Sequence, residues 1–187
     1  MMHRARFVLV AAALMVGGTI AAQPTASATA KISCAQAKGT WSFSPSLPRD
    51  GTSAKVTPVS TIAGSLGGCT GGGVTSGTIK FSSPKSKNGV NCATFKRYDT
   101  VRVTGQLTVT WNTKATSKAT LSLSKVKGHA TQRTVLGTVN RGLFAGYRVS
   151  GLVGYTLPKG ACTSNGLKSV SFKNLRPFVL APTGPSR

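Results

Sequence analysis

Apolar and polar residues alternate almost without interruption along residues 101–111 of this chain. The valines, Leu107 and Trp111 share one face and the threonines the other, which is the period of an antiparallel strand buried on one side. The same period recurs, in shorter form, at residues 41–43, 79–81, 119–123, 149–157 and 170–172. Glycine and asparagine turn signals separate these runs, and no stretch has helical spacing over three turns. The pattern predicts an all-β fold: an antiparallel β-sandwich, with a closed or partly open β-barrel as the alternative.

The first thirty residues have the pattern of an export signal. Arg4 and Arg6 precede an uncharged apolar run over residues 7–22, and small residues with Ala-x-Ala sequences follow up to Ala30. This order predicts a secretory signal peptide over residues 1–30. An apolar run of about 16 residues is short for a membrane span, so we expect release and no stable membrane insertion. We expect a single all-β domain over residues 31–176 and a Pro-rich, disordered tail over residues 177–187.

All four cysteines follow the predicted signal peptide. An even number of cysteines in a secreted chain indicates two disulfides, and four cysteines allow three pairings. We favour Cys69–Cys92, within one local unit, and Cys34–Cys162, which would tie the first strand to the last. The gaps of 35, 23 and 70 residues between successive cysteines lack the close pairs of a zinc site, so no metal site is expected.

The chain carries 24 basic and only 2 acidic residues, Asp50 and Asp99, for a formal net charge of +22. Cleavage after Ala30 would remove two arginines and leave 157 residues with a charge of +20. A glycosidase needs two acids that flank one bond, but Asp50 lies in a turn sequence and Asp99 follows basic residues, so each is more simply a turn former or a salt-bridge partner. Calcium and two-metal sites need clusters of carboxylates, which this chain cannot supply. A serine triad would depend on His129, the only histidine after the signal, and no G-x-S-x-G sequence accompanies it. The sequence therefore predicts a protein that is not an enzyme and has no cofactor.

Such an excess of cations favours polyanionic partners. Outside a cell these are wall phosphates, acidic glycans and shed nucleic acid, and their attraction to the protein should weaken with salt. The candidate contacts lie in two basic segments: Lys80, Lys85, Lys87, Lys96, Arg97, Arg102, Lys114, Lys118, Lys125 and Lys127. Arg133 ends the second segment. Plain solubility of a secreted domain is the other interpretation of the same charge. An inhibitor or protein-binding module that presents the loop of residues 83–91 is the alternative function.

Residues 64–73 are rich in glycine but do not form a phosphate-binding loop. Such a loop ends in Gly-Lys-Ser/Thr at the start of a helix, and here Val74 and Thr75 follow the glycines. A glycine-rich hairpin or bulge around a disulfide is predicted instead.

Four short motifs, at residues 39–47, 68–78, 107–112 and 142–146, resemble a group of small secreted β-proteins from actinobacteria. In that group a Cys-Thr-Gly turn leads to a Val-Thr-Ser-Gly-Thr strand, and a Thr-Trp-like strand and a Phe-Ala-Gly turn follow. The likeness spans most of residues 34–175. It implies export, disulfides and an all-β domain, and it implies no activity, cofactor or catalytic residue. The many lysines of this chain depart from the group, which commonly shows Thr, Ser and Gly.

Overall fold

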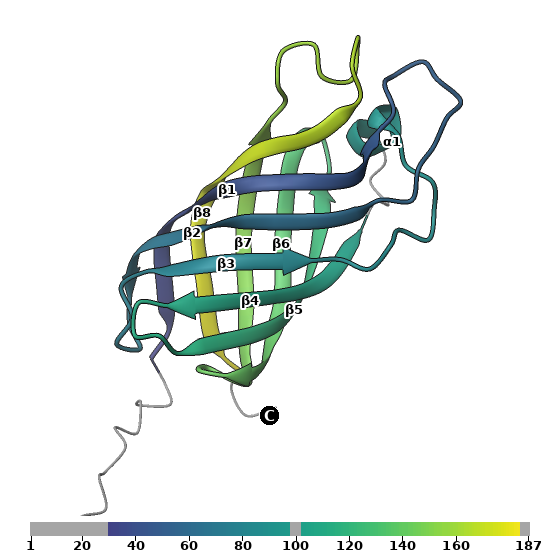
Figure 1. Cartoon of the computed structure of the whole chain (residues 1–187). Helices are drawn as coiled ribbons and strands as arrows, with labels where there is room; N and C mark the ends of the chain where they lie inside the picture. Colours follow the sequence, from purple (N-terminus) through teal and green to yellow (C-terminus); the bar gives the residue numbers. More distant parts are fainter. Residues whose placement is uncertain (1–29, 98–101, 184–187) are drawn as a thin grey trace, which may run out of the picture.

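The computed structural model describes residues 30–97 and 102–183. Its eight antiparallel strands follow one another around a closed barrel, and the last strand pairs with the first (Figure 1). The strands are β1 (Ile32–Leu47), β2 (Val59–Thr70), β3 (Gly77–Ser82), β4 (Val103–Trp111), β5 (Thr116–Val126), β6 (His129–Gly142), β7 (Tyr147–Thr156) and β8 (Leu167–Pro182). A short helix, α1 (Cys92–Arg97), lies between β3 and β4. The all-β prediction is confirmed, with the barrel in place of the favoured sandwich.

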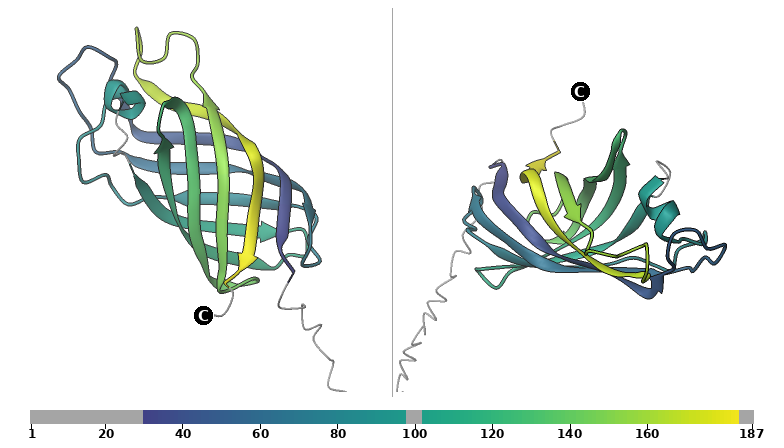
Figure 2. Two further views of the ribbon diagram at one scale, coloured as in Figure 1. Left: turned by 180° about the vertical axis from the view of Figure 1, so that it is seen from behind. Right: turned by 90° about the horizontal axis from the view of Figure 1, so that it is seen from above.

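Closure depends on β1, which pairs with β2 on one side and with β8 on the other. Seen from behind, β6, β7 and β8 cross β1 to β4 at a steep angle on the opposite wall (Figure 2). Closing the barrel requires the strands to curve, and glycines permit this curvature. Gly39 and Gly64 stand directly opposite each other on β1 and β2, and a Cβ on Gly39 would lie 2.2 Å from the carbonyl oxygen of Ala63. Only glycine fits there, so the two strands approach closely where the wall bends.

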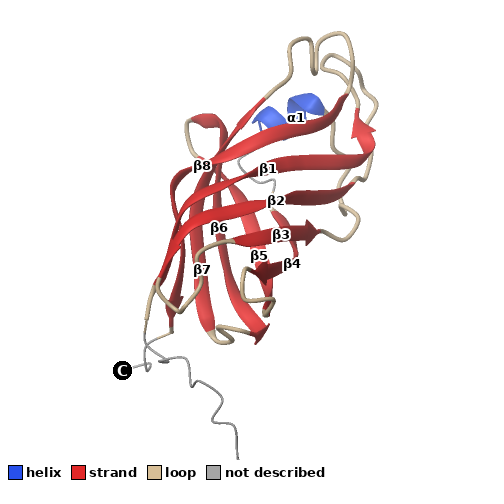
Figure 3. Ribbon diagram, turned by 60° about the vertical axis from the view of Figure 1, so that its left-hand side comes forward, coloured by secondary structure: helices blue, strands red, loops and turns tan. Residues whose placement is uncertain are grey.

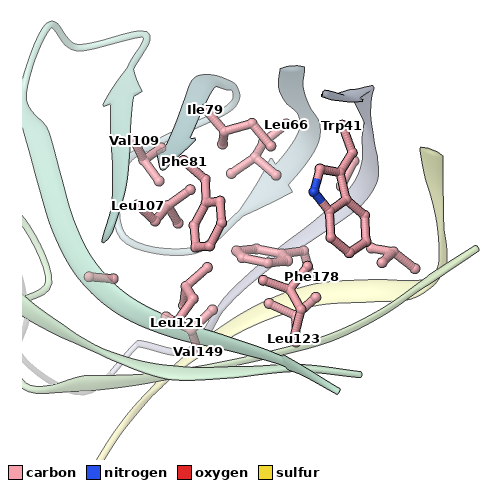
Figure 4. Close-up of a cluster of buried hydrophobic side chains, with 14 of the residues drawn as sticks. Trp41, Leu66, Ile79, Phe81, Leu107, Val109, Leu121, Leu123, Val149 and Phe178 are labelled. Atoms are coloured by element: carbon pink, nitrogen blue, oxygen red, sulfur yellow. The ribbon is translucent and has the colours of Figure 1, made fainter. Parts of the chain in front are cut away.

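Apolar side chains from every strand fill the barrel (Figure 4). Trp41 on β1, Phe81 on β3 and Phe178 on β8 point into the same interior and are at most 7% exposed. A cavity of about 40 Å³ lies among these side chains. An eight-stranded barrel is just wide enough for side chains to fill it, and these large residues do so. That cavity is too small for an organic ligand of ordinary size.

The predicted boundary of the domain at residue 176 is wrong. Residues 177–182 continue β8, where Phe178 pairs with Cys34 and Leu180 with Ile32. Both side chains are buried, so this segment closes the barrel rather than trailing from it. Pro177, which lacks a backbone N–H, falls where the register of β8 shifts against both neighbours. Residues 184–187 of the predicted tail lie outside the described residues, as do residues 1–29 of the predicted signal peptide.

The predicted disulfide pairing is also wrong. The bonds are Cys34–Cys69 and Cys92–Cys162. Cys34 and Cys69 stand in register near one end of the barrel, at the start of β1 and the end of β2. Cys92 opens α1 and Cys162 lies in the β7–β8 loop, both at the other end. Either predicted bond would have had to span the length of the barrel.

Within the described residues, no helix has the length and apolar character needed to cross a membrane.

The glycine-rich segment forms the predicted hairpin. Strand β2 runs through Cys69, and three glycines with positive φ, Gly71, Gly72 and Gly73, begin the turn into β3.

Candidate functional site

The loops at one end of the barrel gather around α1 (Figure 3). The Cys92–Cys162 disulfide joins the first residue of the helix to the β7–β8 loop. The backbone N–H of Cys92 donates to the carbonyl oxygen of Pro48 at 2.9 Å, and that of Asp50 donates to Cys162 at 2.7 Å. The Lys96 ammonium forms an ion pair with the carboxylate of Asp50. The helix is therefore fixed to two loops that are distant in sequence.

Phe95 on α1 packs across the opening of the barrel. It is 2% exposed, and its ring lies 5.1 Å from that of Phe43, 5.4 Å from that of Trp41 and 5.3 Å from that of Tyr155. Edge-to-face and tilted arrangements at these distances are favourable for aromatic pairs. Phe95 thus continues the barrel core up to the helix.

Arg133 on β6 is buried beside Phe95, with an exposed fraction of 1%. Its guanidinium lies over the rings of Phe95 and Tyr155, 5.2 and 5.1 Å from their centres. It donates to the carbonyl oxygens of Phe95 at 2.9 Å and Gln132 at 2.8 Å. Loss of solvation on burial lowers the pKa of Arg133 and raises the pKa of Tyr155. The sequence placed Arg133 in a basic surface segment, and the structure places it in the core.

A cavity of about 520 Å³ lies beside Phe95, between the β1–β2 loop, the β3–β4 loop and the start of β4. Its apolar lining comes from Phe43, Leu47, Val90, Phe95 and Val103. Four exposed cations also line it: Lys55, Lys85, Lys87 and Arg102. The described lining residues include no carboxylate. The cavity therefore combines an apolar interior with a cationic rim.

Hydrogen bonds hold the walls of this cavity in place. The N–H of Ser60 donates to Oγ of Ser83 at 2.9 Å, and the N–H of Ser83 donates to the carbonyl oxygen of Ser60 at 2.8 Å. Val56 and Val90 exchange two backbone hydrogen bonds, at 3.0 and 2.7 Å. The N–H of Thr94 donates to Oδ1 of Asn91 at 2.9 Å, which caps α1. Residues 83–91 are thus anchored at both ends and along their length.

The ten basic residues singled out from the sequence separate into groups. Lys85, Lys87 and Arg102 meet at the cavity rim, where the sequence analysis missed Lys55, because it stands alone among Ser, Thr and Ala. Lys125 and Lys127 lie at the β5–β6 turn, at the end of the barrel that carries α1. Lys114 lies in the β4–β5 turn, at the opposite end of the barrel. Lys96 is paired with Asp50, and Arg97 is the last residue of α1.

The remaining two, Lys80 and Lys118, belong to a row on the outer wall. In register across β3 to β6, Lys80 stands opposite Thr108, Thr108 opposite Lys118, and Lys118 opposite Arg141. Lys80, Lys118 and Arg141 are exposed. We call Lys80, Thr108, Lys118 and Arg141 the wall row. Asp50 is the only acid among the described residues, and Lys96 already binds it, so no described acid neutralises the wall row.

Of the residues weighed for catalysis, the structure describes Asp50 and His129. Asp50 accepts the ion pair from Lys96, and His129 is exposed at the first residue of β6. Asp99 lies outside the described residues. No family model, curated protein or solved structure matches this chain. The resemblance to secreted actinobacterial proteins therefore stays a prediction.

Proposed function

We propose that this protein is a secreted, non-catalytic binding protein that associates with extracellular polyanions through the wall row. The signal pattern of residues 1–30 and the two disulfides support export to an oxidising compartment. Among residues 30–97 and 102–183 no acid pairs with the row, which supports attraction to anions over pairing within the protein.

The observation that carries this proposal is the register of the wall row. Neighbouring strands lie about 4.8 Å apart, so the backbones of Lys118 and Arg141 are about one strand spacing apart and those of Lys80 and Lys118 about two. A polymer that crosses the strands meets these cations in succession, and the hydroxyl of Thr108 lies between Lys80 and Lys118. Long Lys and Arg side chains adjust to the spacing of phosphate, sulfate or carboxylate groups. This suits a repeating anion better than a single ion.

Column retention across a salt series tests the proposal. The probes are immobilised heparin, polyphosphate and duplex DNA, which separate the sources of negative charge. The wall-row variant is Lys80→Gln/Lys118→Gln/Arg141→Gln. A matched control, Lys38→Gln/Lys168→Gln/Arg176→Gln, removes the same charges from exposed positions on β1 and β8. We expect the wall-row variant to elute at clearly lower salt than the control, because each lost contact reduces counterion release.

Two results would count against the proposal. If both triple variants lose retention equally, the charge is spread over the surface and serves solubility. If the unmodified protein is not retained on any of the three polymers at low salt, polyanion binding is excluded. The alternative, a protein-binding loop over residues 83–91, has less support because Ser83 and Val90 are buried and bonded to the walls of the cavity.

A further inference from the structure

The cavity beside Phe95 has features that the wall row does not use. Its cations come from three separate segments: Lys55 lies in the β1–β2 loop, Lys85 and Lys87 lie between β3 and α1, and Arg102 directly precedes β4. Like charges that converge on one opening repel one another, and none of the described lining residues is acidic. An anion at the rim relieves this repulsion, so the rim favours a negatively charged group.

The interior of the cavity has the opposite character. Phe43, Leu47 and Phe95 are at most 5% exposed, and Val90 and Val103 complete the apolar lining. An alkyl or aromatic group that enters removes its own apolar surface from water. A polymer with a charge on every repeat would instead press polar groups against these side chains, which is unfavourable. The interior therefore selects an apolar body.

The cavity is already formed without a ligand. Val90 is hydrogen-bonded to Val56, Ser83 to Ser60, and the helix that carries Phe95 is held by the Cys92–Cys162 disulfide. Binding therefore requires little further ordering of the walls. A volume of about 520 Å³ falls in the range of sites for small organic ligands.

We propose that this cavity binds one small amphiphilic anion. The aromatic or medium-chain alkyl body lies against Phe43, Val90 and Phe95, and a carboxylate, sulfonate or phosphate group lies at the rim among the lysines. This site is separate from the wall row: Lys80 and Lys118 do not line the cavity.

The direct test uses the fluorescent probe 8-anilinonaphthalene-1-sulfonate, which has an apolar aromatic body and one anionic group. We expect saturable binding of one probe per folded protein. The rim variant Lys55→Gln/Lys87→Gln should weaken it about tenfold, since two of four rim cations are lost. The wall variant Lys80→Gln/Lys118→Gln, with the same loss of charge, should bind the probe within about twofold of the unmodified protein.

Displacement of the probe tests the apolar part. We expect decanoate to displace it, 1-decanol to displace it less well, and inorganic phosphate at equal ionic strength to leave it bound. Val103→Trp adds bulk to the lining and should reduce binding. Val126→Trp, at a half-buried valine that does not line the cavity, is its control. Circular dichroism verifies that each variant is folded.

Three results would overturn the inference: several probes per protein, equal losses in the rim and wall variants, or displacement by phosphate as effective as by decanoate. Heparin retention of the rim and wall variants separates this inference from the proposed function. If the wall variant loses retention but no variant affects the probe, the amphiphile site is rejected and polyanion binding stands. If only the rim variant loses the probe and no protein is retained on heparin, polyanion binding is rejected and the amphiphile site stands.

Discussion

Arg133 on β6 donates a hydrogen bond over 2.9 Å to the backbone carbonyl oxygen of Phe95 on α1. The same guanidinium lies over the rings of Phe95 and Tyr155. Its charge is shared among carbonyl dipoles and ring faces, because no described carboxylate pairs with it. One cation of this strongly basic chain thus holds the helix against the barrel.

Replacing Arg133 should destabilise the fold. Arg133→Ala leaves the buried carbonyl oxygen of Phe95 without this donor, removes the part-buried bond to Gln132, and removes a side chain packed against two rings. We expect a loss of about 3 kcal/mol in the free energy of unfolding, measured by denaturant titration. Arg141→Ala, at an exposed position of the same strand, should change it by no more than about 0.5 kcal/mol. Equal effects of the two substitutions would contradict this role of Arg133.

Tyr155 should make the protein lose stability in alkali. Burial raises the pKa of its hydroxyl, so the folded protein keeps a proton that the unfolded chain releases near pH 10. The folded state then binds more protons than the unfolded state, and the free energy of unfolding falls as the pH rises above about 10.

The matched variant is Tyr155→Phe, which lacks the hydrogen bond from the hydroxyl to the carbonyl oxygen of Ala130. We expect it to be about 1 kcal/mol less stable than the unmodified protein at pH 8. At pH 11 this difference should shrink, because only the unmodified protein suffers the titration of Tyr155. A difference that stays constant between pH 8 and pH 11 would refute the argument.

Gly137 on β6 should not tolerate even a methyl group. A Cβ there would lie 2.2 Å from the carbonyl oxygen of Thr120 and 2.5 Å from a methyl carbon of Leu121, so the neighbouring strand must shift. Gly137→Ala should reduce the free energy of unfolding by at least about 2 kcal/mol. Gly67→Ala is the control, since its Cβ would only touch the side chain of Gln36 at 3.6 Å. Thermal unfolding of the two variants measures the difference.

The disulfide pairing is open to peptide mapping, because trypsin places each cysteine in a separate peptide. Cleavage after lysine gives peptides 32–38, 56–80, 88–96 and 160–168. Under non-reducing conditions, we expect 32–38 linked to 56–80, and 88–96 linked to 160–168, by mass spectrometry. A link between 56–80 and 88–96 would restore the pairing that the sequence favoured and would disprove the structural one.

Alternation along the chain was enough to predict strands but not how they close. A half-buried strand has the same period in a sandwich and in a barrel, so residues 101–111 could not distinguish them. The difference lies in the pairing of β1 with β8, which joins opposite ends of the chain. The prolines of residues 177–182 hid the alternation of Phe178 and Leu180. The disulfides were mispaired for a related reason, since which end of the barrel a cysteine occupies depends on strand direction.

The candidate site was predicted only in part. Lys85, Lys87 and Arg102 were recognised as basic, but sequence proximity could not show that Lys55 joins them at one cavity. Nor could it show that Lys80 and Arg141 share a row, because register across β3 to β6 sets that relationship. Arg133 was misplaced because a buried arginine carries no local signature: its partners are backbone carbonyls and rings from other segments.

The pairing of Ile32 with Leu180 also determines when the barrel can close as the chain is synthesised. Each of the first seven strands finds its next neighbour soon after it is made, but β1 keeps one edge open until almost the last residue of β8 exists. During that interval the nascent sheet exposes an unsatisfied row of backbone donors and acceptors, ready to join another chain. Truncation within β8 would make that vulnerable stage permanent, and self-association would then compete with closure.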